Sequence, residues 1–185
     1  MTINRHVQIS VAAHSGDYSK EDEERARVFV REAAKCNPIL ILGGYWGLMK
    51  VVVDEAYGLG LKVVLMLPME KESVDPPPGV ISIRTGMEYR ARSVPLARSG
   101  DVLVALGGEV GTMIEVLMAY AMGKPVVVLT GSNFSTDGLA ASFPNGFDRR
   151  RTAPVNYVDD PIKAAQLACS GAGARLAGDW GGEDV

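Results

Sequence analysis

The sequence contains few of the residues that build metal sites and disulfide frameworks. Only two cysteines and two histidines occur among 185 residues. Cys36 and Cys169 lie far apart in the chain, and neither belongs to a Cys-x-x-Cys motif. The sequence therefore supports neither a disulfide framework nor a zinc site, and we predict no metal.

Long apolar runs and an excess of positive charge are missing as well. No apolar stretch is long enough to span a bilayer, and residues 1–6 lack the apolar core of a secretory signal. The net charge is −3, which favours neither nucleic acid nor an anionic membrane as a partner. We expect a cytoplasmic protein in which any anion site is local.

The composition is typical of an α/β protein, with 47% hydrophobic and 22% charged residues but only 6% aromatic residues. The length suits one domain, predicted over residues 1–170 and followed by a mobile, glycine-rich tail at 171–185. No internal repeat is visible.

Short apolar runs alternate with helical patterns along the chain. Strands are predicted at residues 6–12, 38–42, 61–67, 80–83, 101–106 and 125–129, with a weaker one at 154–158. Helices are predicted at residues 20–35, 48–59, 87–98, 112–122 and 161–169, the first with Ser19 as its N-cap. This alternation predicts a Rossmann-like, doubly wound parallel sheet of about seven strands flanked by helices on both faces. Residues 132–153 form a long loop, functional or disordered, whose basic run at 149–151 is interpreted as solvated.

Two helices carry informative apolar patterns. Helix 112–122 places one apolar stripe towards the core, formed by Ile114, Leu117, Met118 and Ala121. Helix 48–59 is apolar around much of its circumference, more than one sheet can cover. We therefore predict a dimer or tetramer, with Met49, Val52 and Val53 near the contact.

Two glycine-rich turns, each between an apolar run and a helix, are the most informative motifs. The first contains Gly43, Gly44, Tyr45, Trp46 and Gly47, and the second contains Gly107, Gly108, Glu109, Gly111, Thr112 and Glu115. Glycine lets the backbone approach a ligand closely, and the following helix directs unpaired N–H groups at it. Together the turns predict a paired anion-binding crevice.

These turns, with Thr85-Gly86-Met87, Arg92-Ser93 and Arg98-Ser99 between them, resemble one superfamily. It contains the molybdenum-cofactor carrier proteins, the Lonely Guy family once described as lysine decarboxylases, and DNA-processing protein A. The chain is most similar to the carrier-type branch, over roughly residues 6 to 170. The resemblance implies a Rossmann-like oligomer with a phosphorylated ligand, a nucleotide or a molybdopterin-type cofactor. It also implies that Arg92 and Glu115 take the places of the two catalytic residues of the Lonely Guy enzymes.

The motif departs from those enzymes at one position. Glu109 replaces a glycine of their Pro-Gly-Gly sequence, which puts a carboxylate beside the expected phosphate. Two like charges about 4 Å apart repel by about 1 kcal/mol in water and by more in a drier cleft. Either Glu109 points away, or phosphate is not held as in the hydrolases.

Each candidate residue also has a purely structural interpretation. The glycines of the two turns can serve tight strand-to-helix packing, and Thr112 can brace its helix. Glu115 can be a carboxylate stabilised by the helix dipole, and Arg92 a surface arginine. Tyr45 and Trp46 can be packing partners rather than stacking platforms, and His14 an ordinary loop residue.

Three functions are compatible with these patterns. The first is binding of a phosphorylated heterocycle, with the two turns, Arg92 and Thr112 around the phosphate and sugar and Tyr45 or Trp46 beside the ring. The second is a phosphoribohydrolase that cleaves the N-glycosidic bond of a nucleoside 5′-monophosphate with Arg92 and Glu115. The third, a DNA-associated scaffold, is disfavoured by the net charge. Glu109 favours binding over hydrolysis.

Overall fold

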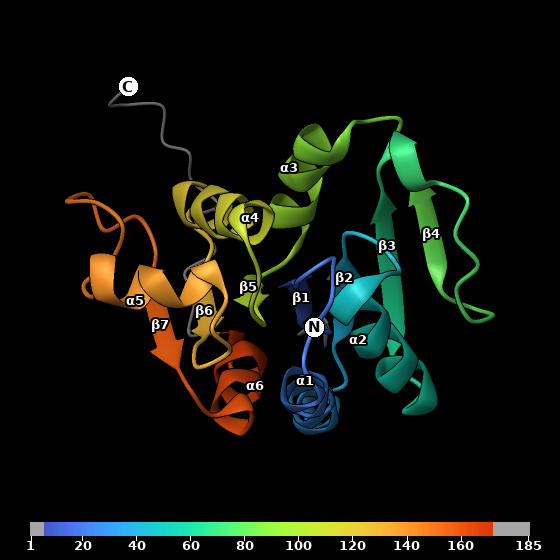
Figure 1. Ribbon diagram of the computed structural model, residues 1–185, viewed down its shortest axis with the longest axis horizontal. Coiled ribbons are helices and arrows are strands. Elements are labelled where there is room, and N and C mark those ends of the chain that lie inside the picture. Colours follow the sequence, from blue (N-terminus) through green and yellow to red (C-terminus); the bar gives the residue numbers. More distant parts are fainter. Residues whose placement is uncertain (1–5, 172–185) are drawn as a thin grey trace, which may run out of the picture.

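One sheet of seven parallel strands forms the centre of the computed structural model, which describes residues 6–171 (Figure 1). The strand order is β4-β3-β2-β1-β5-β6-β7. The strands are β1 (Gln8–Ala12), β2 (Ile39–Leu42), β3 (Lys62–Leu67), β4 (Ile81–Arg84), β5 (Val102–Ala105), β6 (Val126–Leu129) and β7 (Val155–Val158). Because β1 pairs with both β2 and β5, the order reverses there, and ligands of such sheets bind beside this reversal.

Helices cover both faces of the sheet. Figure 1 shows α1, α2 and α6 on one face and α3 and α4 on the other. The helices are α1 (Lys20–Ala33), α2 (Gly47–Gly58), α3 (Tyr89–Ser99), α4 (Val110–Ala121), α5 (Gly138–Ser142) and α6 (Pro161–Cys169). Short 3₁₀ turns are η1 (Ala34–Cys36), η2 (Met69–Lys71) and η3 (Ser135–Asp137).

The structure confirms the predicted fold class and all twelve predicted strands and helices, with ends shifted by at most two residues. Ser19 caps α1 as expected, in a capping box with Asp22. The predicted loop 132–153 is not structureless, because it contains η3 and α5. The predicted tail, apart from Gly171, lies outside the described residues. No helix within residues 6–171 is long and apolar enough to cross a membrane.

The packing of α2 corrects the expectation that Met49, Val52 and Val53 lie near a contact between two copies of the chain. Met49, Val52 and Val53 are at most 5% exposed within this single chain. They belong to one core cluster with residues of α1, α6 and strands β1 to β3. Neighbouring helices of the same chain therefore cover the apolar surface of α2 that the sheet leaves open. This surface gives no reason for a contact with a second copy.

The buried face of α4 also differs from the prediction. Leu117 is 40% exposed, whereas Val116, Ala119 and Tyr120 face the core together with Thr112 and Glu115. The hydrophobic pattern suggested a different face because it treats threonine and glutamate as outward-facing. In this helix those two polar residues point inwards.

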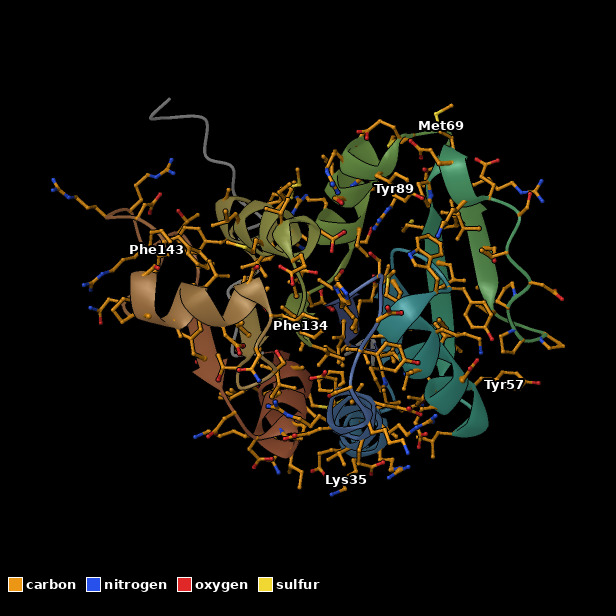
Figure 2. The ribbon with its side chains drawn as sticks, in the orientation of Figure 1. Lys35, Tyr57, Met69, Tyr89, Phe134 and Phe143 are labelled. Carbon is orange, nitrogen blue, oxygen red and sulfur yellow. A yellow bond between two sulfur atoms is a disulfide. The ribbon has the colours of Figure 1, made fainter. Side chains whose placement is uncertain are left out.

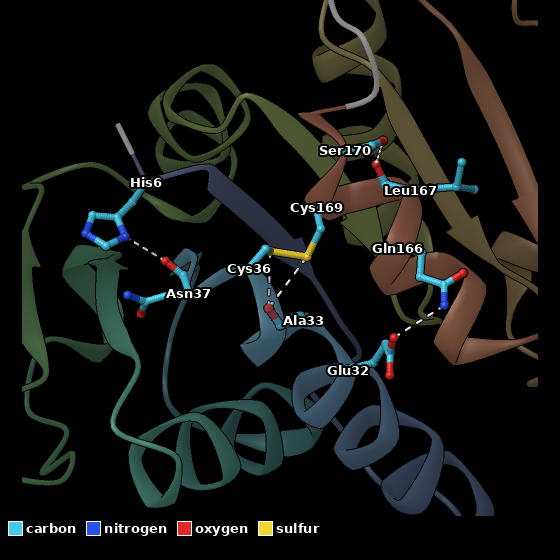
Figure 3. The surroundings of a disulfide bond; sticks show 9 residues. All are labelled: His6, Glu32, Ala33, Cys36, Asn37, Gln166, Leu167, Cys169 and Ser170. Carbon is cyan, nitrogen blue, oxygen red and sulfur yellow. Dashed lines mark hydrogen bonds between the residues drawn. A yellow bond between two sulfur atoms is a disulfide. The ribbon is translucent and has the colours of Figure 1, made fainter. Parts of the chain in front are cut away.

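The cysteines are paired, contrary to expectation. Cys36 at the end of η1 and Cys169 at the end of α6 form a disulfide, with their Cα atoms 5.8 Å apart (Figure 3). α1 and α6 are neighbours on one face of the sheet, which brings together two residues that lie 133 positions apart in sequence. Spacing along the chain could not show this proximity.

Candidate functional site

A cavity of about 310 Å³ lies at the carboxyl ends of the central strands. Its walls come from the segments after β1, β2 and β3 and from the first turns of α3 and α4. The lining residues are Ala13, His14, Ser15, Trp46, Met49, Lys71, Tyr89, Arg90, Arg92, Glu109, Gly111, Thr112 and Glu115. Figure 2 labels one of them, Tyr89, at the start of α3. This is the position that a switch between β1 and β5 predicts for a ligand site.

A buried ion pair forms the floor of the cavity. Nη1 of Arg92 lies 3.1 Å from Oε1 of Glu115, and the Ser93 hydroxyl lies 2.9 Å from the same oxygen. Arg92 and Glu115 are 6% and 7% exposed. Because α3 and α4 pack side by side, residues 23 positions apart meet here.

Gly43 makes room for this pair. A Cβ atom at this position would lie 2.0 Å from Nη1 of Arg92. The guanidinium group therefore occupies the space that any other side chain at the end of β2 would fill. Gly43 of the first glycine turn thus leaves space for the side chain of Arg92, and its own backbone does not line the cavity.

The environment of Glu115 has opposing effects on its charge. Burial raises the pKa of Glu115 above the usual value, while the charge of Arg92 and the hydrogen bond from Ser93 lower it. The net direction is upwards. Glu115 thus holds its proton to a higher pH than a solvated glutamate, a property often found in catalytic and binding carboxyls.

Arg92 has a further nitrogen without a partner. Within residues 6–171, its Nε is the one fully buried side-chain polar atom that makes no hydrogen bond. An unpaired buried donor costs about 1–3 kcal/mol. This nitrogen is closed to solvent, so a ligand in the cavity reaches Arg92 through other atoms of the side chain.

The N-terminus of α4 opens onto the same cavity. Its N-cap, Glu109, makes no capping hydrogen bond with its side chain. The first intrahelical bond runs from the Met113 N–H to the Glu109 carbonyl, so the amides of Val110, Gly111 and Thr112 precede it. A helix end of this kind attracts anions.

The remainder of the second glycine turn is covered by the segment after β6. The Gly108 amide donates to Oγ1 of Thr136, and the Thr136 amide donates to the Gly108 carbonyl. Phe134, labelled in Figure 2, packs against Gly107. Glu109 accepts a hydrogen bond from Ser135, which draws its carboxylate towards this segment while it still lines the cavity.

The two aromatic residues of the first turn lie in different places. Trp46 lines the cavity, and the Lys71 ammonium lies 4.6 Å from the centre of its ring system. Tyr45 instead donates a hydrogen bond to Asp54 of α2, at 2.6 Å, and packs against Lys50. Trp46 therefore borders the cavity and Tyr45 does not.

Five of the eleven candidate residues line this cavity: Trp46, Arg92, Gly111, Thr112 and Glu115. Gly43, Gly44, Tyr45, Gly107 and Gly108 do not line it, and Gly47 borders a neighbouring hollow with Ser15, Gly16, Asp17 and Tyr18. The structure adds lining residues that the sequence analysis did not select, among them His14, Lys71, Tyr89 and Arg90. His14 follows β1, so the expected switch between strands could have drawn attention to it. Nothing in the pattern of residues marked Lys71 or Tyr89.

The chain belongs to the SLOG cluster4 family, whose model matches residues 6–161. The architecture agrees with this assignment. The structure described as TM1055 is 31% identical in sequence and superposes with a TM-score of 0.79, covering 87% of this chain and 97% of its own.

Two further neighbours are molybdenum-cofactor proteins. The molybdenum cofactor carrier protein of Chlamydomonas reinhardtii is 27% identical, with a TM-score of 0.70, and the match covers 90% of this chain and 98% of that one. The molybdenum cofactor binding protein of Rippkaea orientalis shares the fold at 24% identity, with a TM-score of 0.74 and coverages of 90% and 97%. The resemblance to the carrier-type branch is thereby confirmed.

Proposed function

We propose that this protein binds a small phosphorylated heterocycle, a nucleotide or a molybdopterin-type cofactor, in the cavity between α3 and α4. The observation that carries the proposal is the open N-terminus of α4 beside the guanidinium group of Arg92, since both border the same cavity. The phosphate accepts hydrogen bonds from Arg92, Thr112 and the first amides of α4. The ring lies against Trp46.

The charges of the cavity suit an anion although the whole chain is acidic. Lys71, Arg90 and Arg92 line it together with Glu109 and Glu115. Since the pKa of Glu115 is raised, the balance is positive by one charge or more. Nucleic acid is a poorer candidate, because the net charge of the chain is −3.

Thermal denaturation with a panel of ligands tests the proposal. Adenosine 5′-monophosphate and molybdopterin-type cofactors are compared with adenosine, which lacks the phosphate. A ligand at a 100-fold excess over its Kd stabilises the native state by about 2.7 kcal/mol, a shift of several degrees. Arg92→Lys keeps the charge but removes the planar guanidinium group and is expected to abolish most of the shift. Arg98→Lys, an exposed substitution on the same helix, is expected to preserve it. Absence of stabilisation by every phosphorylated heterocycle would refute the proposal.

The Arg92–Glu115 pair favours a second candidate, hydrolysis of the N-glycosidic bond of a nucleoside 5′-monophosphate. The transition state of that reaction resembles an oxocarbenium ion, which a carboxylate can stabilise or whose attacking water it can orient. Incubation with purine nucleoside 5′-monophosphates would release free base, and Glu115→Gln would stop it. Release that survives the substitution would exclude Glu115 from the mechanism.

We also propose that the protein forms a dimer or a tetramer, through α3 and α4 rather than α2. Val94, Val110 and Leu117 on these two helices are 43%, 59% and 40% exposed. Light scattering at micromolar concentration is expected to give at least twice the chain mass of 19.7 kDa. A monodisperse species of that single mass would disprove this part of the proposal.

A further inference from the structure

Ser93 is a buried polar residue on the core side of α3 for which the proposed function gives no role. Its side chain is 1% exposed. The hydroxyl lies 2.9 Å from Oε1 of Glu115 and 3.2 Å from the carbonyl oxygen of Tyr89, one turn earlier in the helix. One hydroxyl proton thus has two acceptors within reach.

A serine hydroxyl donates one hydrogen bond and accepts others. When Glu115 is ionised, Ser93 donates its proton to Oε1. When Glu115 is protonated, the carboxyl proton on Oε1 is donated to Oγ, and Ser93 turns its own proton to the Tyr89 carbonyl. The carboxyl proton of Glu115 therefore has an acceptor in Ser93, which neither Arg92, a pure donor, nor a hydrocarbon side chain could provide.

The second carboxyl oxygen is left for the cavity. Arg92 and Ser93 both contact Oε1, and Oε2 takes part in no hydrogen bond recorded within residues 6–171. Oε2 is also not fully buried. Within the described part of the chain, Arg92 Nε is the one fully buried side-chain polar atom without a hydrogen bond. Because Glu115 lines the cavity, Oε2 is its ligand-facing atom.

We propose that Ser93 is the positioning residue of this site: its hydroxyl fixes Oε1 of Glu115 in either protonation state and so presents Oε2 to the ligand. The claim that Oε2 faces a ligand rests on the proposed function. The contact between Ser93 and Glu115 is present in the ligand-free protein and can be tested there.

Several other charged or titratable groups line the cavity around Glu115 and are independent of Ser93. They are Arg90, Arg92 and Tyr89 of α3, Glu109 at the N-cap of α4, His14 after β1 and Lys71 of η2. The positive charges of Arg92 and Arg90 favour the ionised carboxylate. A valid test therefore changes Ser93 alone and leaves these groups in place.

The test is the titration of Glu115 in ligand-free protein, followed by the ¹³C shift of its carboxyl carbon and assigned with Glu115→Gln. Ser93→Ala removes a hydrogen bond that is stronger to the ionised carboxylate than to the neutral carboxyl group, and the variant is therefore expected to raise the pKa of Glu115 by about one unit. Ser93→Thr retains a hydroxyl and is expected to titrate near the wild type. Ser99→Ala is the matched control, because the Ser99 hydroxyl also donates to a carbonyl one turn earlier in α3 but has no contact with Glu115.

An unchanged pKa in Ser93→Ala, or equal shifts in the alanine and threonine variants, would overturn the proposal. If the alanine variant does not fold, Ser93→Cys preserves the volume with a weaker donor, and a pKa equal to the wild-type value would overturn it in the same way. Titration with adenosine 5′-monophosphate separates the two proposals. A shifted pKa without any binding of the nucleotide would contradict the proposed function and leave the role of Ser93 intact.

Discussion

Glu115 shows how one residue acquires unusual properties from its place in the fold. It lies one turn inside α4, on the face that packs against α3. Burial alone would keep the carboxyl group neutral, and the fixed charge of Arg92 opposes this. The result is a carboxyl group whose charge depends on its neighbours, and substitutions at this residue should reveal that dependence.

The raised pKa of Glu115 makes a prediction about stability and pH. A carboxyl group whose pKa is higher in the folded than in the unfolded protein stabilises the fold fully below the unfolded value, near 4.5. This contribution is lost as the pH rises through the folded value. Glu115→Gln does not titrate, so the unfolding free energy of the wild type relative to this variant should fall with rising pH above about 4.5. Urea denaturation of both proteins at a series of pH values would measure it. A difference that is constant or rises with pH would contradict the assignment.

The close contact between Gly43 and Arg92 leads to a second prediction about a single residue. Gly43→Ala places a methyl group where the Arg92 guanidinium lies, so Arg92 must leave its position beside Glu115. We expect at least a tenfold loss of affinity for adenosine 5′-monophosphate, measured by calorimetry, because Arg92 no longer reaches the phosphate.

Gly58→Ala is the matched control for this loss. Apart from the adjoining helix backbone and chain neighbours, no atom lies within 4 Å of a Cβ at Gly58, which ends α2. Alanine in this helical position should preserve the affinity and change the stability by no more than about 0.5–1 kcal/mol in the favourable direction. Equal affinities of the two variants would show that Gly43 has no part in the site.

At the scale of elements, the sequence predicted the type and order of strands and helices but not which helix faces are buried. Apolar runs and terminal glycines mark strands and helix ends, because those signals act over a few residues. The orientation of α4 depends on α3, which supplies Arg92 and Ser93 as partners for Glu115. Arg92 and Glu115 could be selected through the resemblance to the Lonely Guy enzymes, whereas Lys71 and Tyr89 become neighbours of the site only after the chain folds.

The packing of α2 predicts unequal costs for two leucine substitutions. Leu48 is completely buried and Leu59, at the other end of the helix, is 45% exposed. Leu48→Ala should lower the unfolding free energy by about 2–5 kcal/mol, and Leu59→Ala by about 0.5 kcal/mol or less. Chemical denaturation at several protein concentrations would test this. If a second copy covered α2, the loss caused by Leu48→Ala would change with concentration.

At the scale of the whole molecule, the disulfide and the site lie at opposite ends of the strands. Cys36 precedes β2, at the amino ends of the strands, whereas the cavity lies at their carboxyl ends. The disulfide closes a loop of 133 residues and constrains the unfolded chain. Replacing both cysteines by serine should cost about 2–5 kcal/mol of stability, measured by denaturation, without changing the affinity for a ligand. A loss of affinity in a folded double variant would show that the two regions are coupled.

The central claim is that the cavity between α3 and α4 holds the phosphate of a heterocyclic ligand. A crystal structure of the protein with adenosine 5′-monophosphate or a molybdopterin-type cofactor tests it most directly. The account predicts phosphate oxygens within hydrogen-bond distance of Arg92 Nε and of the first amides of α4, with the ring against Trp46. A cavity that stays empty at saturating concentrations, or a phosphate bound elsewhere, would contradict it.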